Sequence, residues 1–325
     1  MVPPSQTTKL VLVLALLAAC SKNEVCDAPA DVVGRAPARL SETGLYADVG
    51  AGELAPGVLP YTPRFELWSD GATKRRWILL PAGARVDTSR MDDWQFPEGT
   101  KLWKEFTRDG VRVETRLFWK HGPRAADWTA MAYVWREGDA IAAPEGVVDA
   151  RGTAHRVPAA GECFACHDGT PSRVLGFSAI QLARAGEPRA GEVDLDDAVR
   201  RGMLSAPPAA APVVPGSPAA QEALGYLHAN CGHCHNTRRP ADATVRCFDP
   251  SASFDFSLRT DRLGSVEETP AYTSGRASLR APGSAGASRV VDLMSDRPGM
   301  PPLGSRVVDD AGVEALRRWV RELGP

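Results

Sequence analysis

The chain has 325 residues and a formal net charge of −2, with 30 glycines and 27 prolines. This length allows two modest domains, and the glycine and proline content is typical of a loop-rich protein. The balanced charge and the lack of a basic block argue against nucleic acid as a partner. Beyond residue 19, no apolar run is long enough for a membrane span.

The first 19 residues predict a lipoprotein signal peptide. Lys9 precedes a short apolar run that ends at Cys20 in "LAAC", which is similar to a bacterial lipobox. Acylation of Cys20 would anchor the exported chain to a lipid bilayer, facing the periplasm. By resemblance to proteobacterial lipoproteins, Ser21 favours the outer over the inner membrane. The alternative is an ordinary signal peptide with an incidental cysteine.

A tether over 20–40 should lead into a β-rich domain over 41–204. Runs such as "RRWILLPAG" and "WTAMAYVWREGDAI" alternate apolar and polar residues between turn residues, which indicates strands. The Asp-Gly pair in "TRDGVRV" predicts a tight hairpin. A Pro/Ala-rich linker over 205–216 then predicts an extended connection.

Helices are expected in the last segment, 217–325. Ser217 followed by Pro218 is a helix start, and apolar residues at helical spacing then lead to Cys231. The end of the chain, "DDAGVEALRRWVRELGP", predicts an amphipathic helix. The sequence therefore predicts an α+β chain, with a β-rich domain followed by an all-α domain.

Two repeated motifs carry the chemistry. "CFACH" holds Cys163, Cys166 and His167. "CGHCH", within the later segment 229–236, repeats the same spacing of two cysteines and a histidine. Four thiolates could bind zinc, and one pair could be a redox dithiol, but neither needs a histidine after each pair. Covalent haem uses every residue, because two cysteines form thioethers and the histidine ligates the iron.

The motifs therefore predict two covalently bound haem c groups. Cys163, Cys166, Cys231 and Cys234 would form the thioethers, and His167 and His235 would be the proximal ligands. Cys26 and Cys247 remain, and in an oxidising compartment they either form a disulfide or stay separate thiols.

Met300 lies in "RPGMPPLG", a loop between the second motif and the terminal helix. Its thioether suits a haem iron, which makes it the predicted second axial ligand there. The order of helix, motif, Met-Pro-Pro loop and helix resembles a class I cytochrome c. That resemblance implies a cytochrome c-like domain over 217–325, with His235 and Met300 as the axial pair.

The whole chain resembles a family of exported dihaem c-type cytochromes, many of them lipoproteins. The resemblance is carried by "FELWSDGATKRRWILLP", "FPEGTKLWKEF", "VETRLFWK", "CFACHDG", "LGFSAIQL" and "ALGYLHANCGHCHN". This resemblance implies the class of protein, but it does not indicate the pathway in which the protein takes part.

The sixth ligand of the first haem is open. His155 is the nearest candidate in sequence, with His121, Met131 and Met203 as alternatives. "FPEGTKLWKEF" also resembles small β-sheet cytochromes with a lysine cross-linked to the haem. That resemblance points to Lys101 and Lys104, and the alternative is that both are ordinary strand lysines.

The predicted function is single-electron transfer between periplasmic or membrane redox proteins. The alternative is a haem enzyme, peroxidase-like or reactive with hydroxylamine or nitric oxide, with a five-coordinate first haem.

Overall fold

The computed structural model describes residues 35–184, 191–241, 254–279 and 288–324. The predicted signal peptide, Cys20, Cys26 and Cys247 lie outside the described residues. Within the described part of the chain, no helix has both the length and the apolar character needed to cross a bilayer.

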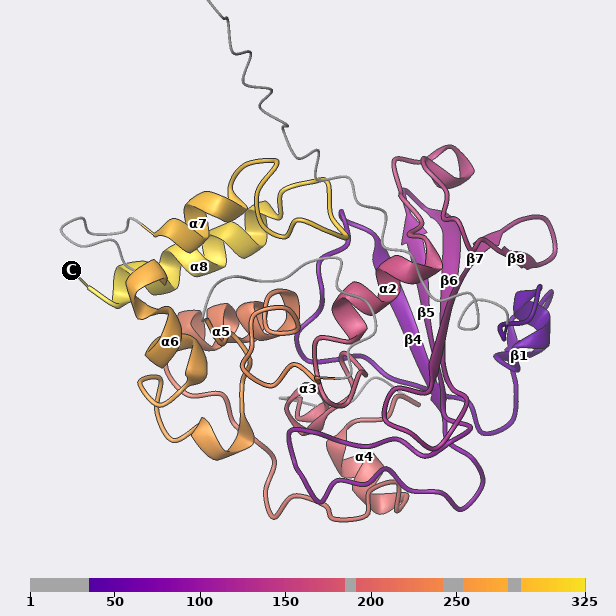
Figure 1. Cartoon of the computed structure of the whole chain (residues 1–325), viewed down its shortest axis with the longest axis horizontal. Helices are drawn as coiled ribbons and strands as arrows, with labels where there is room; N and C mark the ends of the chain where they lie inside the picture. Colours follow the sequence, from indigo (N-terminus) through magenta and orange to yellow (C-terminus); the bar gives the residue numbers. More distant parts are fainter. Residues whose placement is uncertain (1–34, 185–190, 242–253, 280–287, 325) are drawn as a thin grey trace, which may run out of the picture.

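A six-stranded antiparallel sheet dominates the first half of the chain (Figure 1). Its strands follow the order of the sequence, each bonded to the next. They are β3 (Leu59–Pro60), β4 (Thr73–Leu79), β5 (Lys101–Arg108), β6 (Val111–Lys120), β7 (Trp128–Trp135) and β8 (Ala140–Ala142). A small ribbon of β1 (Tyr46–Asp48) and β2 (Glu53–Leu54) lies beside it.

The predicted hairpin joins β5 to β6. Arg108 pairs with Val111, and between them Asp109 and Gly110 have φ angles of 51° and 77°. Both turn residues thus adopt the positive φ that a tight two-residue turn requires, which confirms the Asp-Gly prediction.

The two faces of the sheet pack against different parts of the chain. One face carries Trp103, Leu117 and Met131 and is covered by the 3-10 turn η1 (Leu40–Glu42) and the β1–β2 ribbon. The other face carries Leu102 and Phe118 and packs against residues from the region of the first motif. This second face is where the candidate site begins.

Seven helices and two further 3-10 turns follow the sheet in the described residues. They are η2 (Ala150–Gly152), α2 (Ala160–His167), α3 (Ala179–Leu182), α4 (Leu195–Arg200), α5 (Pro218–Asn230), η3 (Thr260–Arg262), α6 (Pro270–Leu279), α7 (Arg289–Met294) and α8 (Asp310–Glu322). Ser217 caps α5 by accepting from the Ala220 N–H, and Pro218 begins the helix as predicted. In α8, which Asp309 caps, Val313, Leu316 and Val320 are buried on one stripe, and Trp319 is buried beside them.

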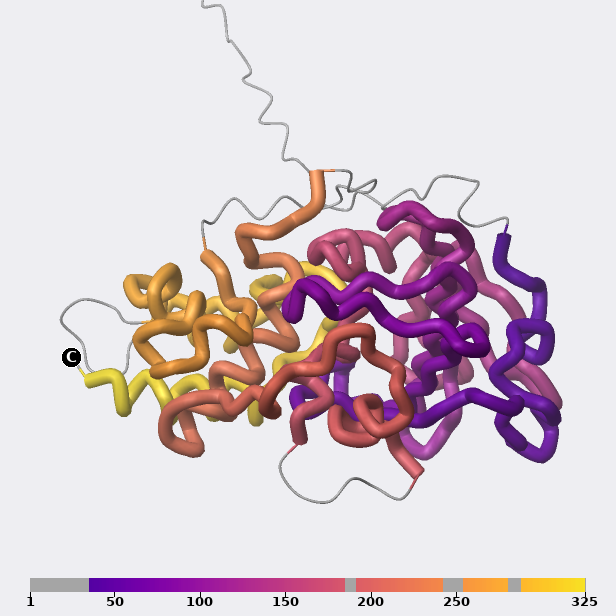
Figure 2. Tube along the Cα trace, turned by 90° about the horizontal axis from the view of Figure 1, so that it is seen from below, coloured from indigo at the N-terminus to yellow at the C-terminus, as the bar shows by residue number. Residues whose placement is uncertain are grey.

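The predicted all-α, class I cytochrome c-like domain over 217–325 is wrong. The chain forms a β-rich body with a six-stranded sheet followed by a few helices, and no such all-α domain is evident in the described residues (Figures 1 and 2). The physical reason is that these helices do not complete their own core. Ile180 and Phe65, from before the linker, belong to the same apolar cluster as Leu224 and Leu316.

Polar contacts also join the helices to the sheet half. The Asp70 carboxylate accepts from Ser305 Oγ at 2.7 Å and from the N–H of Val307 at 3.0 Å. Asn230, at the end of α5, accepts from the Trp68 N–H at 2.7 Å. The predicted linker, 205–216, contains no helix or strand, and its Val214 is fully buried in the helical cluster.

Gly225 tests the dependence of α5 on the sheet half. A Cβ at this position would lie 2.0 Å from Cε1 of Phe65. On an open helix face, Gly→Ala stabilises by about 1 kcal/mol. Here we expect Gly225→Ala to destabilise by about 1–3 kcal/mol, because the ring must move out of a packed position. Chemical denaturation measures the change, and exposed Glu222→Ala is the control. Stabilisation by Gly225→Ala would contradict the packing.

Candidate haem-binding site

The first motif occupies α2, which packs against β7. Cys163, Cys166 and His167 are three and four residues apart, so they share one side of the helix. The helix start is held by Glu162, whose carboxylate accepts from the Ala159 N–H at 2.8 Å. Both cysteines are free and partly buried. Burial raises the pKa of Cys163 to about 11, which keeps it a thiol at neutral pH.

The His167 ring is oriented by one hydrogen bond. Its Nδ1 lies 2.7 Å from the backbone oxygen of Arg173. A carbonyl oxygen only accepts, so Nδ1 carries the hydrogen and Nε2 keeps its lone pair. Burial lowers the pKa of His167 to about 4, so the ring is neutral at physiological pH. The Phe118 ring lies 4.2 Å away, between centroids.

A buried ion pair holds the carbonyl that orients His167. Arg173 and Asp168 are each 1 % exposed and pair with one another within the loop that follows α2. The pair closes this loop and brings the Arg173 carbonyl back to the histidine one residue before Asp168. Asp168 is therefore a positioning residue, because it reaches the imidazole only through the loop.

The second motif forms a turn directly after α5. The N–H groups of Cys234 and His235 donate to the Cys231 carbonyl at 3.0 and 2.8 Å, so the turn continues the helical direction. The His235 ring lies 5.7 Å from Phe256 and 6.4 Å from Phe254. Its Nδ1 is buried without a hydrogen-bond partner in the described structure. Burial lowers the pKa of His235, which favours the neutral imidazole that ligates metals.

The fold places the two motifs in contact. A Cβ on Gly169 would lie 1.8 Å from the backbone oxygen of His233, so only glycine fits there. Asn236 bridges the motifs, since its Nδ2 lies 2.9 Å from the carbonyl oxygens of both Gly169 and Gly232. Two segments about 65 residues apart in sequence therefore form one unit.

Cys166, His233 and Cys234 offer ligand atoms within 4.8 Å of one another. Cys166 donates a hydrogen bond to Cys234, which raises the pKa of Cys166 to about 12 and lowers that of Cys234. Cys163 and Cys231 do not belong to this group. The four thiols thus do not converge on a single four-thiolate zinc site among the residues that the structure describes.

The predicted sixth ligand of the first haem, His155, is 5 % exposed and engaged elsewhere. Its Nε2 lies 2.7 Å from the Glu114 carboxylate. Met131 packs on the opposite face of the sheet, whereas Met203 is buried in the same apolar cluster as Phe164 of α2. His121 contacts Thr129 through Nδ1 at 3.1 Å.

Met300 packs against the same apolar cluster as Cys231. Its N–H donates to the Leu293 carbonyl at 2.8 Å, and its own carbonyl accepts from Arg297 Nη1 at 2.7 Å. The loop is therefore fixed by its backbone on the second motif's side of the molecule.

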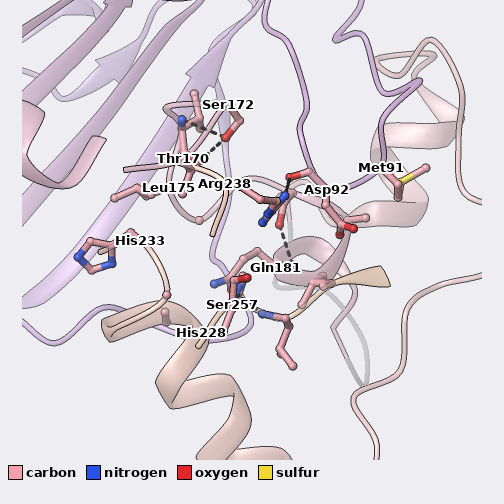
Figure 3. Close-up of a pocket in the computed structure, with 18 residues that line it drawn as sticks. Met91, Asp92, Thr170, Ser172, Leu175, Gln181, His228, His233, Arg238 and Ser257 are labelled. Carbon is pink, nitrogen blue, oxygen red and sulfur yellow. Dashed lines mark hydrogen bonds between the residues drawn. The ribbon is translucent and has the colours of Figure 1, made fainter. Parts of the chain in front are cut away.

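A pocket beside the second motif is lined by His228 and His233, by Asp92 and Arg238, and by the loop after α2 (Figure 3). His228 accepts at Nδ1 from the Leu258 N–H at 3.0 Å. Its neutral form therefore carries hydrogen on Nε2, the reverse of His167, and it offers no lone pair to a metal.

Sequence reasoning missed Asn236 and the Asp168–Arg173 pair. Asn236 and Asp168 each directly follow a motif histidine, and Arg173 lies six residues after His167. Their roles depend on how the loops fold back, which the spacing of residues in the sequence does not reveal. It also missed that Arg76, Lys104 and Arg116 form a row of charged residues at inward-facing positions of three neighbouring strands, since Lys104 was considered only as a cross-link candidate. Reading the strand alternation residue by residue would have found them.

Comparisons with family models, with curated proteins and with solved structures found no match to this chain.

The burial of His228 leads to a prediction about the stability of the protein in acid. Burial lowers the pKa of His228 to about 4. The unfolded chain, with an ordinary histidine pKa of about 6.5, takes up the proton first, so stability falls as the pH drops from about 6.5 towards 4. His228→Asn keeps an acceptor for Leu258 but does not titrate. We expect the variant to lose about 1–2 kcal/mol less than the wild type between pH 7 and 5. Denaturation at both pH values measures this, and equal losses would contradict it.

Proposed function

We propose that the chain is an exported, membrane-anchored dihaem c-type cytochrome that passes single electrons between periplasmic or membrane redox proteins. One haem c is held by Cys163, Cys166 and His167, and the other by Cys231, Cys234 and His235. The observation that carries the proposal is the Nδ1–H of His167 donated to Arg173, which leaves Nε2 free to ligate. Anchoring through Cys20 rests on the sequence alone.

The donor set fits covalent haem. All four motif cysteines are free, partly buried thiols, and each pair lies beside a neutral histidine. Haem supplies the iron that gains and loses one electron, while the protein sets its potential through ligands, burial and hydrogen bonds. His167 is held in place by Arg173. Two aromatic rings lie beside His235, and Met300 is the proposed second axial ligand on that side.

One observation favours the haem enzyme as a second candidate. His155 Nε2 is engaged by Glu114, so the sixth ligand nearest in sequence is not free for the first iron. A five-coordinate first haem would bind small molecules. The Cys166–His233–Cys234 group favours a third arrangement, in which a metal ion joins the two motifs.

A single set of measurements separates these candidates. The purified chain is assayed for pyridine haemochrome and zinc, and its oxidised and reduced spectra are recorded with and without carbon monoxide. Two haems per chain, both low-spin and indifferent to carbon monoxide, are expected. One high-spin haem that binds carbon monoxide would favour the enzyme. Zinc without haem would refute the cytochrome.

Met300→Ala tests the second axial ligand. The weak methionine-to-iron charge-transfer band of the oxidised protein should disappear, because the sulfur ligand is gone, while the haem count stays at two. Met294→Ala, which removes a buried methionine of the same apolar cluster that is not a proposed ligand, is the matched control and should leave the band in place. A band that survives Met300→Ala would assign that iron to another ligand.

A further inference from the structure

Three cations lie side by side on the face of the sheet that packs against the α2 region. Arg76 of β4 pairs in register with Lys104 of β5, and Lys104 pairs with Arg116 of β6. Their side chains share a face with Phe118, which contacts the His167 ring. Like charges directly opposite one another destabilise a sheet. The row therefore requires a compensating charge.

The neighbouring carboxylates compensate only part of this charge. Glu66 pairs with Arg76 at 3.0 Å and lies 3.7 Å from Lys74, and Glu114 pairs with Arg116 at 2.5 Å. Asp309 also acts electrostatically on Lys74. Four cations and three carboxylates still leave the row with a positive surplus. Lys104 has no ion-pair partner among the described residues, and its Nζ lies 4.8 Å from the Phe106 ring centroid.

Arg76 provides an independent sign that a ligand belongs here. Its side chain is 5 % exposed, and its Nη1 is buried without a hydrogen-bond partner in the described structure. A buried, unpaired guanidinium nitrogen is costly unless an acceptor approaches it. Burial, followed by the charges of Arg76, Lys74 and Arg116, also holds the pKa of Lys104 well below its ordinary value.

We propose that the row Arg76–Lys104–Arg116 binds the carboxylates of an anionic ligand held between the sheet and the first motif. Arginine forks match carboxylates in a bidentate way, and lysine adds a point charge. The ligand is the pair of propionates of the first haem, an assignment that rests on the proposed function. A free dicarboxylate is the other source of the same chemistry.

The row lies close enough to the motif to serve this role. Arg116 acts electrostatically on Cys163 and Cys166, and Lys104 acts on His167. Lys101, by contrast, donates to the Thr43 carbonyl at 2.7 Å, on the opposite face of the sheet. The two lysines of "TKLWKEF" thus serve different faces, and only Lys104 belongs to the row.

Lys104→Met in the full, purified chain tests the row through the sign of its effect on thermal stability. Without an anion, the substitution removes a buried like charge and should raise the melting temperature. With a bound carboxylate, it removes a compensating charge, and we expect the melting temperature to fall by about 3–6 °C. Arg85→Met removes an equal charge from an exposed turn and is the control. A raised melting temperature for Lys104→Met would overturn the proposal.

The source of the anion is identified in parallel. If two haems are counted, the propionates are supported when Lys104→Met keeps both haems, shifts one reduction potential to a more negative value, and leaves the protein indifferent to added succinate. If no haem is counted, the proposed function fails on its own, and succinate should then raise the melting temperature of the wild type but not of Lys104→Met. Absence of both responses would overturn the anion site.

Discussion

The close approach of Gly169 to the backbone of His233 is the constraint on which the rest of the structure depends. The two backbones leave no room for a side chain, and Asn236 joins them by hydrogen bonds to both. This contact brings α2, which lies on the sheet, against the turn that ends α5. The helices after the linker therefore pack against the sheet half.

The sheet face towards α2 carries both apolar side chains and a row of cations. Leu102 and Phe118 supply the apolar contact, while Arg76, Lys104 and Arg116 occupy the same face at a cost that the two nearby carboxylates do not remove. Such an arrangement costs stability, because an apolar row would pack with less penalty. Strands β4, β5 and β6 therefore both pack against the α2 region and carry the row of cations.

Local features of the fold could be predicted from sequence, and contacts between distant segments could not. The Asp109–Gly110 hairpin and the Ser217 cap follow from a few adjacent residues, and both are present. The all-α domain was predicted from helix patterns and from a resemblance to class I cytochrome c, and neither can reveal that Phe65 and Ile180 join the helical core. Likewise, spacing identified His167, but its tautomer depends on the path that carries the Arg173 carbonyl back to it.

The contact between the motifs also has a consequence for biogenesis. In the folded protein, the thiols of Cys166 and Cys234 lie within 4.8 Å of one another beside the backbone junction of Gly169 and His233, and both are partly buried. If each motif receives a haem, we expect both additions to occur before this junction closes, while the two thiols are still apart. The junction would then act as a checkpoint in assembly, since a chain that closes early would trap its cysteines unmodified.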